Sequence, residues 1–465
     1  MASSFRDPLN TALNHALTHL EALDTTPVAT TTELQTLRTR LGKPLTNKGV
    51  PAEQVINELV HDIEGGIMGS AGGRFFGWVI GGSLPSALAA DWLTSTWDQN
   101  SGHHGCGLAA AVVEEIAGEW LKEILHLPQH CSFALVTGCQ MAHVTCLAAA
   151  RQALLEKRGW DVGQQGLYGA LPIRIISSEL RHETFERAAR LLGLGLAQVT
   201  YLSTDTRGCL PSEALQRTLE ENPSAPTIVL LQAGDVNTGA YDSFECLIPI
   251  AKRHNAWVHV DGAFGLWAAA SPRYQHLVKG AKAADSWATD GHKWLNVPFD
   301  CGYAIIANPQ AHRASMTAQA SYLSEGEARN QLDWTPEWSR RARAFPTYAA
   351  LRQLGKKGVA NLVERCCQHA HTLVMEMGKL PGAEVVSEPI INQGLVRFLD
   401  RKPGATDADH DRRTDDVIKK IVASGEAFFG GTTWRGRRAM RVSVSNWQTS
   451  DEHVRRVIGA VKKSL

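Results

Sequence analysis

The stretch WVHVDGAF (Trp257–Phe264) decides the fold class of this chain. Residues Ala256–Val260 form a near-continuous apolar run, which is typical of a strand buried on both faces of a parallel sheet. Asp261 follows directly, so this strand delivers a carboxylate at its carboxyl end. Ligands bind along that edge in open α/β sheets. The stretch therefore predicts a buried strand that carries a functional carboxylate into a ligand site.

Similar runs recur on both sides of this strand. They are Phe133–Val136, Ile173–Ser177, Thr227–Leu231 and Tyr303–Ala307. Helical patterns separate them, at Ala142–Lys157, Glu183–Leu192 and Pro211–Asn222. Strands that alternate with helices predict βαβ units and a mostly parallel sheet, which places the middle of the chain in the α/β class.

The two ends of the chain differ from its middle. The first residues read as helices with polar connectors, whereas AMRVSVS (Ala439–Ser445) alternates apolar and polar residues, as a half-exposed antiparallel strand does. We therefore expect an N-terminal helical segment (1–72), a large domain (73–350) and a small α+β domain (351–465). A hinge is expected near 345–360.

Composition and charge exclude several classes of protein. Of the 465 residues, 44% are hydrophobic and 20% are charged, which is globular composition. Lys plus Arg and Asp plus Glu both number 47, so the basic excess of a nucleic-acid-binding protein is absent. The longest apolar stretches, such as Gly107–Val113, are too short to cross a bilayer, the N-terminus has no signal pattern, and nine scattered cysteines make no disulfide framework. We expect a soluble, cytoplasmic protein with no nucleic-acid or membrane partner.

Two further segments carry polar groups that suit the same sheet edge. ADSWATDGHKWLNVPFDCG (Ala284–Gly302) holds Lys293 in a Gly-His-Lys-Trp turn, and VTGCQMAHVTC (Val136–Cys146) reads as a strand, a turn and a helix. The first amides of that helix would bind an anion, as helix N-termini bind phosphates. They belong to Gly138, Cys139 and Gln140.

A phosphate cradle, a buried carboxylate and a lysine are the set that pyridoxal 5′-phosphate requires. The lysine forms a Schiff base, and the carboxylate keeps the pyridine nitrogen protonated so that the ring accepts electrons. Each signal is weak alone, but Asp261 and Lys293 occur in this order, 32 residues apart, within these motifs. The combination predicts a pyridoxal-phosphate enzyme.

From about Gly73 to its end, the chain resembles the group II pyridoxal-phosphate-dependent amino acid decarboxylases, the family of aromatic-amino-acid, glutamate and histidine decarboxylases. HVDGAF is similar to the family's His-Val-Asp-Ala-Ala motif, and GHKWLNVPFDCG to its Pro-His-Lys-Trp motif. RFFGWVIGGSLPSALAADWL is similar to the segment that leads into the substrate pocket. The resemblance implies the aspartate-aminotransferase-like architecture called fold type I. It also implies a homodimer with sites built from two subunits.

The resemblance implies roles for single residues. Lys293 is then the Schiff-base lysine, Asp261 pairs with the pyridine nitrogen, and His182 stacks on the cofactor ring. The remaining cofactor contacts implied are Gly138, Cys139, Gln140, Asn237, Thr238, Ala263 and His292. His143 and Cys146 lie one helical turn apart and are expected to be an ordinary helix face, because two ligands do not make a tetrahedral metal site. No metal is expected.

Departures from the family bear on the substrate. The family pieces that line the substrate pocket correspond here to Arg74, Phe75, His103 and His104. They bring cationic or hydrogen-bonding groups where aromatic decarboxylases have rings, so we expect an amino acid with a polar or acidic side chain. The alternative is that Arg74 pairs internally, with Glu64 or Asp62, and that the histidines face solvent.

Two more departures concern the chemistry. Asp290 replaces the family's Asn two residues before the motif histidine, and a carboxylate would repel a phosphate. We therefore expect Asp290 to point away or to be neutralised by a partner. The mobile-loop tyrosine of the aromatic enzymes falls on Gln331, and the nearest tyrosine is Tyr322.

The resemblance favours loss of the α-carboxylate of an L-amino acid, which gives an amine and CO₂. Three alternatives stay open. One is an aminotransferase, in which Lys293 moves the proton and Arg441 binds a carboxylate. Another is a carbonyl-forming decarboxylase, suggested by the missing loop tyrosine. The third is a catalytically silent binding relative, against which the intact Lys293, Asp261 and His182 speak.

Overall fold

The computed structural model describes residues 5–317 and 329–465. The chain forms two compact units. Unit 1 comprises Met1–Ile80, Thr372–Val386 and Leu395–Leu465; unit 2 comprises Gly81–His371 and Ser387–Gly394. This division differs from the expected one, because the N-terminal helices belong to the same unit as the C-terminal sheet. The chain passes from unit 2 to unit 1 within helix α12 (Ala344–Gly378), whose helical backbone is interrupted at Gly355.

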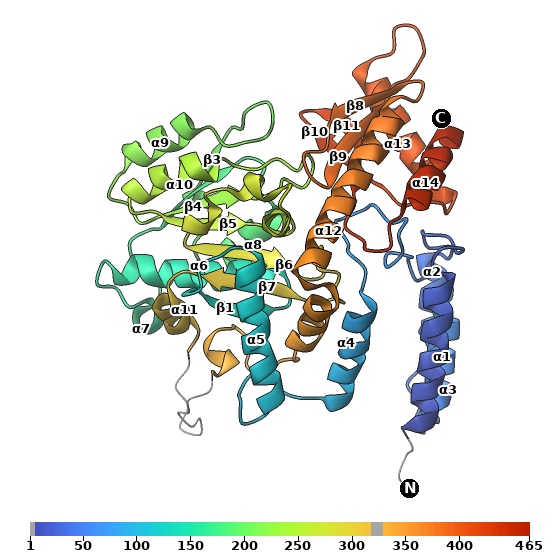
Figure 1. Cartoon of the computed structure of the whole chain (residues 1–465), viewed down its shortest axis with the longest axis horizontal. Coiled ribbons are helices and arrows are strands. Elements are labelled where there is room, and N and C mark those ends of the chain that lie inside the picture. The colour runs from blue at the N-terminus through green and yellow to red at the C-terminus, as the bar shows by residue number, and fades with distance from the viewer. Residues whose placement is uncertain (1–4, 318–328) are drawn as a thin grey trace. The chain divides into compact units, whose positions relative to one another are not determined.

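Unit 2 is built on a seven-stranded sheet with the order β1-β7-β6-β5-β4-β2-β3 (Figure 1). Its strands are β1 (Ser132–Val136), β2 (Arg174–Ser178), β3 (Val199–Leu202), β4 (Thr227–Gln232), β5 (Trp257–Asp261), β6 (Ser286–Asp290) and β7 (Gly302–Ile306). β7 runs antiparallel to both of its neighbours, and the pairs from β6 to β3 are parallel. The expected mostly parallel sheet is confirmed, and the carboxyl ends of six strands share one edge.

Helices cover this sheet and supply its core. They are α4 (Pro85–Trp97), α5 (Leu108–Ile124), α6 (Cys139–Glu156), α7 (Val162–Gln165), α8 (Glu183–Leu191), α9 (Ser212–Glu221), α10 (Phe244–Arg253) and α11 (Pro309–Met316). α6 is buried along most of its length and packs on β1, β5, β6 and β7, with α8 and α11 beside it. Its alanines allow this close approach, since they place little more than a methyl group between helix and sheet. The start of α6 is thereby fixed at the carboxyl edge of the strands.

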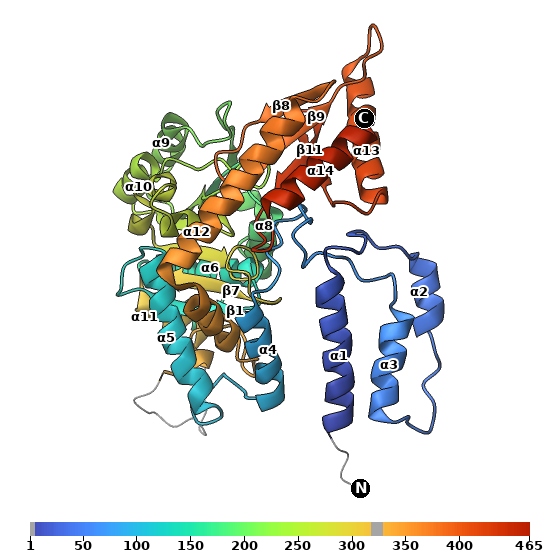
Figure 2. The same ribbon diagram turned by 45° about the vertical axis from the view of Figure 1, so that its right-hand side comes forward.

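Unit 1 combines helices with a second sheet. α1 (Arg6–Ala22) and α3 (Ala52–Asp62) lie side by side, and α2 (Leu34–Leu41) contacts α3 (Figure 2). The sheet has the order β10-β11-β9-β8, with β8 (Ala383–Ser387), β9 (Gln393–Phe398), β10 (Gly430–Trp434) and β11 (Arg437–Ser443). α13 (Asp407–Ala423) packs on β11, and α14 (Asp451–Ser464) packs on α13. The expected C-terminal strand and helix are present, and Ser450 caps α14 by accepting the His453 N–H.

Among the described residues, no helix is both long enough and apolar enough to span a bilayer.

Candidate active site

Polar side chains gather at the carboxyl edge of the unit 2 sheet. Asp261 ends β5, Asp290 ends β6, and Lys293 lies in the turn that follows β6. His182 follows β2 and is the N-cap of α8, where its side chain accepts the Thr184 N–H. The parallel strands therefore bring together residues from three segments that are far apart in sequence, at the edge where α/β sheets bind ligands.

Lys293 lies among negative groups. Its Nζ is 3.1 Å from Asp290 Oδ2 and 5.9 Å from the centre of the Phe264 ring. Burial lowers the pKa of Lys293, but Asp290, Cys139 and Asp261 together raise it above its usual value. The amine is therefore held as an ammonium, close to a carboxylate.

Asp290 does not point away from the site. Its Oδ1 accepts the N–H of Cys139 at 2.6 Å, and its Oδ2 faces Lys293. An anion at the start of α6 is favoured by the helix dipole, so the carboxylate is neutralised from two sides. The expectation of a neutralising partner holds, and that partner is Lys293 together with the helix terminus. The Cys139 amide expected to bind phosphate is engaged by this carboxylate.

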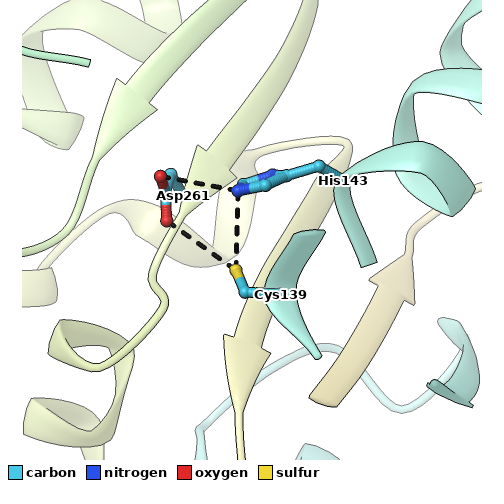
Figure 3. Close-up of side chains that lie close together, drawn as sticks. All are labelled: Cys139, His143 and Asp261. Carbon is cyan, nitrogen blue, oxygen red and sulfur yellow. Dashed lines mark hydrogen bonds and ion pairs between the residues drawn. The ribbon is translucent and has the colours of Figure 1, made fainter. Parts of the chain in front are cut away.

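Asp261 is a carboxylate surrounded by hydrogen-bonding and charged groups. It is buried, and its Oδ1 accepts the Ala263 N–H at 3.1 Å. Its Oδ2 lies 3.5 Å from His143 Nε2, and its Oδ1 lies 3.9 Å from Cys139 Sγ (Figure 3). Burial alone would raise the pKa of Asp261, but His143, His182 and Lys293 hold it well below its usual range. The carboxylate is therefore charged inside the protein.

His143 was not expected in the site. The structure overturns its assignment to an ordinary helix face, because its ring is fully buried between Asp261 and His259. Cys146 does not accompany it and instead contacts the Trp287 carbonyl oxygen at 3.5 Å. The sequence predicts only that His259 and Asp261, two residues apart on a strand, share a face of the sheet, and no pattern in it brings His143 to them.

Cys139, His143 and Asp261 are residue types that also bind metal ions, and their ligand atoms lie within 4.8 Å of one another. Burial is the main cause that raises the pKa of the Cys139 thiol well above its usual value. A protonated thiol is a poor metal ligand. His143 Nε2 and Cys139 Sγ both contact the Asp261 carboxylate, and these contacts stabilise it.

His182 keeps an open side chain at this edge. Its Nδ1 lies 2.8 Å from Thr184 Oγ1, and the residue is exposed in the described chain. Desolvation lowers the pKa of His182, and Lys293 adds to this, while Asp261 opposes it. A neutral imidazole beside Asp261 and Lys293 can cover a flat ring.

The other expected cofactor contacts line the same edge. A Cβ on Gly138 would lie 3.1 Å from His292 Cε1, so a larger residue there would require the His292 ring to shift. The His292 ring stacks on Phe299 at 4.3 Å and accepts the Cys301 N–H. The amides of Asn237 and Thr238 donate to Asp235 Oδ1, which shapes the loop after β4.

Pyridoxal phosphate fits this donor set. Gln140 carries buried Oε1 and Nε2 atoms that have no hydrogen-bond partner among the described residues, directly at the expected phosphate turn. Lys293 supplies the amine that would hold the aldehyde of the cofactor, and Asp261 supplies the carboxylate that would pair with its pyridine nitrogen. Ala263, next to Asp261, is small enough to leave space for a ring.

Arg74 belongs to unit 1. Its guanidinium is engaged by the backbone of that unit, which differs from the expected contact with substrate. Its side chain is 1% exposed, and its two terminal nitrogens contact five backbone carbonyls. These carbonyls belong to Leu23, Asp24, Thr26, Gly425 and Glu426. Neither Glu64 nor Asp62 is among these partners. The guanidinium is therefore committed to tying two segments of unit 1 together.

The remaining substrate candidates are divided between the units. Phe75 is buried in unit 1 and stacks on Phe428 at 4.7 Å. His103 and His104 stack on each other in unit 2, and His104 Nδ1 lies 2.7 Å from Asn330 Oδ1. Their contact with a substrate stays a prediction.

Gln331 is the residue that the resemblance matches to the family's loop tyrosine. Gln331 is fully buried, and its Nε2 donates to the Ala111 carbonyl at 3.3 Å. Tyr322 lies outside the described residues.

Comparisons with known proteins point to one family. Residues 35–399 match the model of the pyridoxal-dependent decarboxylase conserved domain. The chain is 25% identical to an aromatic-L-amino-acid decarboxylase of Bacillus atrophaeus, over 97% of this chain and 93% of that protein. It is 24% identical to tryptophan decarboxylase 1 of Oryza sativa subsp. japonica, over 100% of this chain and 94% of that protein.

Solved structures share the fold. A crystal structure of Oryza sativa TDC with PLP and tryptamine superposes with a TM-score of 0.92, at 22% identity, and covers 100% of this chain and 98% of that chain. Mouse CSAD in its apo form has a TM-score of 0.91 at 21% identity, over 98% of both chains. The family model spans most of the sequence, and the fold is that of type I pyridoxal-phosphate enzymes. The chain therefore belongs to the pyridoxal-dependent decarboxylases, carboxy-lyases that use pyridoxal 5′-phosphate to remove the carboxylate of an amino acid.

Proposed function

We propose that this enzyme converts an L-amino acid to the corresponding amine and CO₂, with Lys293 as the lysine that holds the cofactor and Asp261 as the partner of its pyridine nitrogen. One observation carries the assignment. Asp261 and Lys293 lie close enough at one sheet edge for each to shift the pKa of the other, and both shift the pKa of His182. Such mutual perturbation in a cluster of ionisable groups is typical of an active site.

Each residue has a distinct task in this proposal. The charged Asp261 favours a proton on the pyridine nitrogen, and the cofactor, when bound, accepts the electron pair left as the Cα–carboxylate bond breaks. His182, neutral and exposed, covers the open face of the ring. Asp290 holds the Lys293 ammonium in place, with its Oδ2 3.1 Å from Nζ.

A substrate panel with all products measured separately tests the proposal. Phenylalanine, tyrosine and tryptophan come first, because the two curated relatives above are named for aromatic amino acids. Polar amino acids, namely glutamate, aspartate and 2,4-diaminobutyrate, follow, because His103 and His104 bring hydrogen-bonding groups to positions where aromatic decarboxylases have aromatic rings. We expect equal amounts of CO₂ and amine from the best substrate. Release of a keto acid without CO₂ would contradict the proposal and favour transamination.

A second candidate is decarboxylation to an aldehyde. Gln331, at the position matched to the loop tyrosine, is buried and bonded to a backbone carbonyl, so it offers no phenol to protonate Cα. A phenylacetaldehyde synthase of a Rosa hybrid cultivar is 23% identical to this chain, over 97% of this chain and 91% of that protein. This route consumes dioxygen and water and releases aldehyde, CO₂, ammonia and hydrogen peroxide. Oxygen uptake that matches CO₂ release would establish it in place of amine formation.

We also propose that the enzyme is a homodimer. α1 has no buried residue, and its leucines at helical spacing, Leu9, Leu13, Leu17 and Leu20, are exposed. An apolar helix face of this length is covered in most proteins, and a second copy supplies a matching surface. Light scattering should give twice the chain mass for the wild type and a lower mass for Leu13→Asp/Leu17→Asp. An unchanged monomeric mass for the wild type would contradict the dimer.

A cytoplasmic location is part of the same proposal. None of the nine cysteines, all of which lie in the described residues, forms a disulfide, which is usual for a reducing compartment. Fractionation of the native host tests this location, and recovery with secreted proteins would contradict it.

A further inference from the structure

A row of buried polar side chains leads away from Asp261, behind the site. Trp257 Nε1 lies 2.9 Å from Ser286 Oγ, which lies 2.9 Å from His259 Nδ1. His259 Nε2 lies 2.8 Å from His143 Nδ1. His143 Nε2 then lies 3.5 Å from Asp261 Oδ2, as the dashed line in Figure 3 marks. We call Trp257, Ser286, His259 and His143 the histidine network.

The network has one direction. An indole N–H can only donate, and an ionised carboxylate can only accept, so the two ends fix the protons between them. Burial and the neighbouring His143 lower the pKa of His259 to about 3, which leaves one proton on its ring. With His143 Nε2–H toward Asp261, His259 Nε2–H donates to His143 Nδ1, and Ser286 O–H donates to His259 Nδ1. Every link then has one donor and one acceptor.

We propose that His143 and His259 are positioning residues, which hold Asp261 charged and oriented toward the pyridine nitrogen of the cofactor. This inference rests on the proposed role of Asp261. The reason is electrostatic: a carboxylate buried to this depth loses its hydration, and only nearby donors replace it. A row of aligned donors stabilises the carboxylate more than one donor does, because each link polarises the next.

The groups that face Asp261 come from several elements. His143 and Cys139 lie on α6, His259 lies on β5 itself, and His182 and Lys293 follow β2 and β6. His182 and Lys293 also face the cofactor and serve it directly. His143 is fully buried behind the site, where it contacts Asp261 and the thiol of Cys139, so its removal tests the network without removing a group expected to touch the cofactor.

The test compares His143→Leu, which removes the donor, with His143→Gln, which keeps an N–H near Asp261. The control is His312→Gln. His312 is another fully buried histidine of unit 2, with its pKa lowered to about 3 by burial first and by Arg329, but its ring contacts Ser132 Oγ and Trp334 O. All variants are purified, stripped of cofactor and titrated with pyridoxal phosphate across the acidic and neutral range, which needs no known substrate.

We expect His143→Leu to raise the dissociation constant of pyridoxal phosphate about tenfold, as for loss of a hydrogen bond to a charged group. The acidic limb of its binding profile and of kcat should move to higher pH, because burial then raises the pKa of Asp261. His143→Gln should recover part of both effects. His312→Gln should lower Tm and leave both profiles in place. His259→Leu should add little to His143→Leu, since both act through one contact.

An unshifted acidic limb in His143→Leu, or additive effects of the two substitutions, would overturn the proposal. So would loss of cofactor affinity in chelator-treated wild type that zinc restores, because His143 would then be a metal ligand. Borohydride reduction separates this outcome from failure of the proposed function. Labelling of Lys293 in wild type and His143→Leu keeps the cofactor assignment, whereas no labelling in wild type removes it.

Discussion

Arg74 in unit 1 and Lys293 in unit 2 are both cations with little solvent around them, but their partners differ in kind. The terminal nitrogens of Arg74 contact five backbone carbonyls, which keep the same charge at every pH, and a Glu426 carboxylate oxygen lies farther off, 3.9 Å from Nη1. Lys293 faces the side-chain carboxylate of Asp290 and shares its surroundings with Asp261. A cation held by backbone stabilises a fold, whereas one surrounded by groups that gain and lose protons can take part in chemistry.

The difference corrects a common inference from sequence. Arg74 stands in a segment that resembles a substrate-binding piece, and its charge suggested recognition of an acidic side chain. Its carbonyl partners show why the charge is there: the guanidinium is planar and has five donors, which suits several carbonyls at once. Sequence position alone did not distinguish the two cations, and the identity of their partners did.

The largest effect is expected from Lys293→Ala. The substitution removes the amine that holds the cofactor, so decarboxylation should fall below detection and borohydride should no longer fix a pyridoxyl group to the protein. Peptide mapping after reduction of the wild type checks the site of attachment. Lys279→Ala is the control, because Lys279 pairs with Glu245 on the surface of the same unit. Labelling that persists without Lys293 would assign the wrong lysine.

Asp261→Asn should cost at least about 10²-fold in kcat, the size of effect found for single electrostatic contacts to a reacting centre. An amide cannot hold the pyridine nitrogen as a cation, while the cofactor remains attached through Lys293. Steady-state kinetics and the visible absorbance of the bound cofactor measure both. Asp205→Asn, at a turn far along the sequence, should leave kcat unchanged. Near-normal turnover of Asp261→Asn would place the nitrogen's partner elsewhere.

Arg74→Leu should lower the stability of the protein by about 2 kcal/mol, because several buried carbonyls lose their donor together. The ranking of amino acid substrates should stay the same. Chemical denaturation and the substrate panel measure the two quantities. Arg456→Ala is the control in the same unit: its side chain is 37% exposed and pairs with Glu426, so its loss should cost under about 1 kcal/mol. A changed ranking in Arg74→Leu would restore the substrate role.

The sequence predicted those strands of unit 2 whose residues are apolar throughout. It missed the edge strand β3 (Val199–Leu202), and it missed β6 because SWATD (Ser286–Asp290) reads as polar although all five residues are buried. Ser286 can be buried because Trp257 Nε1 and His259 Nδ1 satisfy its hydroxyl. Such compensation arises only when two strands meet, so a pattern of polarity along one strand does not contain it.

The site was predictable where a motif holds the residues together. Lys293 and Asp261 stand in recognisable words, and the sheet brings both to one edge. The contact between His143 and His259 joins residues 116 positions apart, and a carbonyl bound by Arg74 lies 351 positions away. Neither contact follows from spacing or periodicity, because each depends on how helices and strands pack.

The smallest effect is expected from Asp290→Asn, and it concerns the partner that distinguishes Lys293 from Arg74. Asp290 leads the groups that raise the pKa of Lys293 against the effect of burial. Without that charge the pKa of Lys293 falls, so more of the amine is neutral at neutral pH and able to capture the cofactor's aldehyde. Each unit of pKa corresponds to about tenfold in the neutral fraction. The rate of capture by the apoprotein should therefore rise severalfold, and its midpoint should move to lower pH.

Rapid mixing of apoprotein with cofactor, followed by visible absorbance, measures this rate. The variant keeps an oxygen that can accept the Cys139 N–H, so the start of α6 is preserved. Pyridoxal, which has no phosphate, provides the decisive comparison. An acceleration with both aldehydes reports the pKa of Lys293, whereas an acceleration with pyridoxal phosphate alone reports relief of repulsion between Asp290 and the phosphate. Slower capture of both aldehydes would mean that the carboxylate positions Lys293 more than it keeps it charged, and Asp290 would then resemble the fixed partners of Arg74.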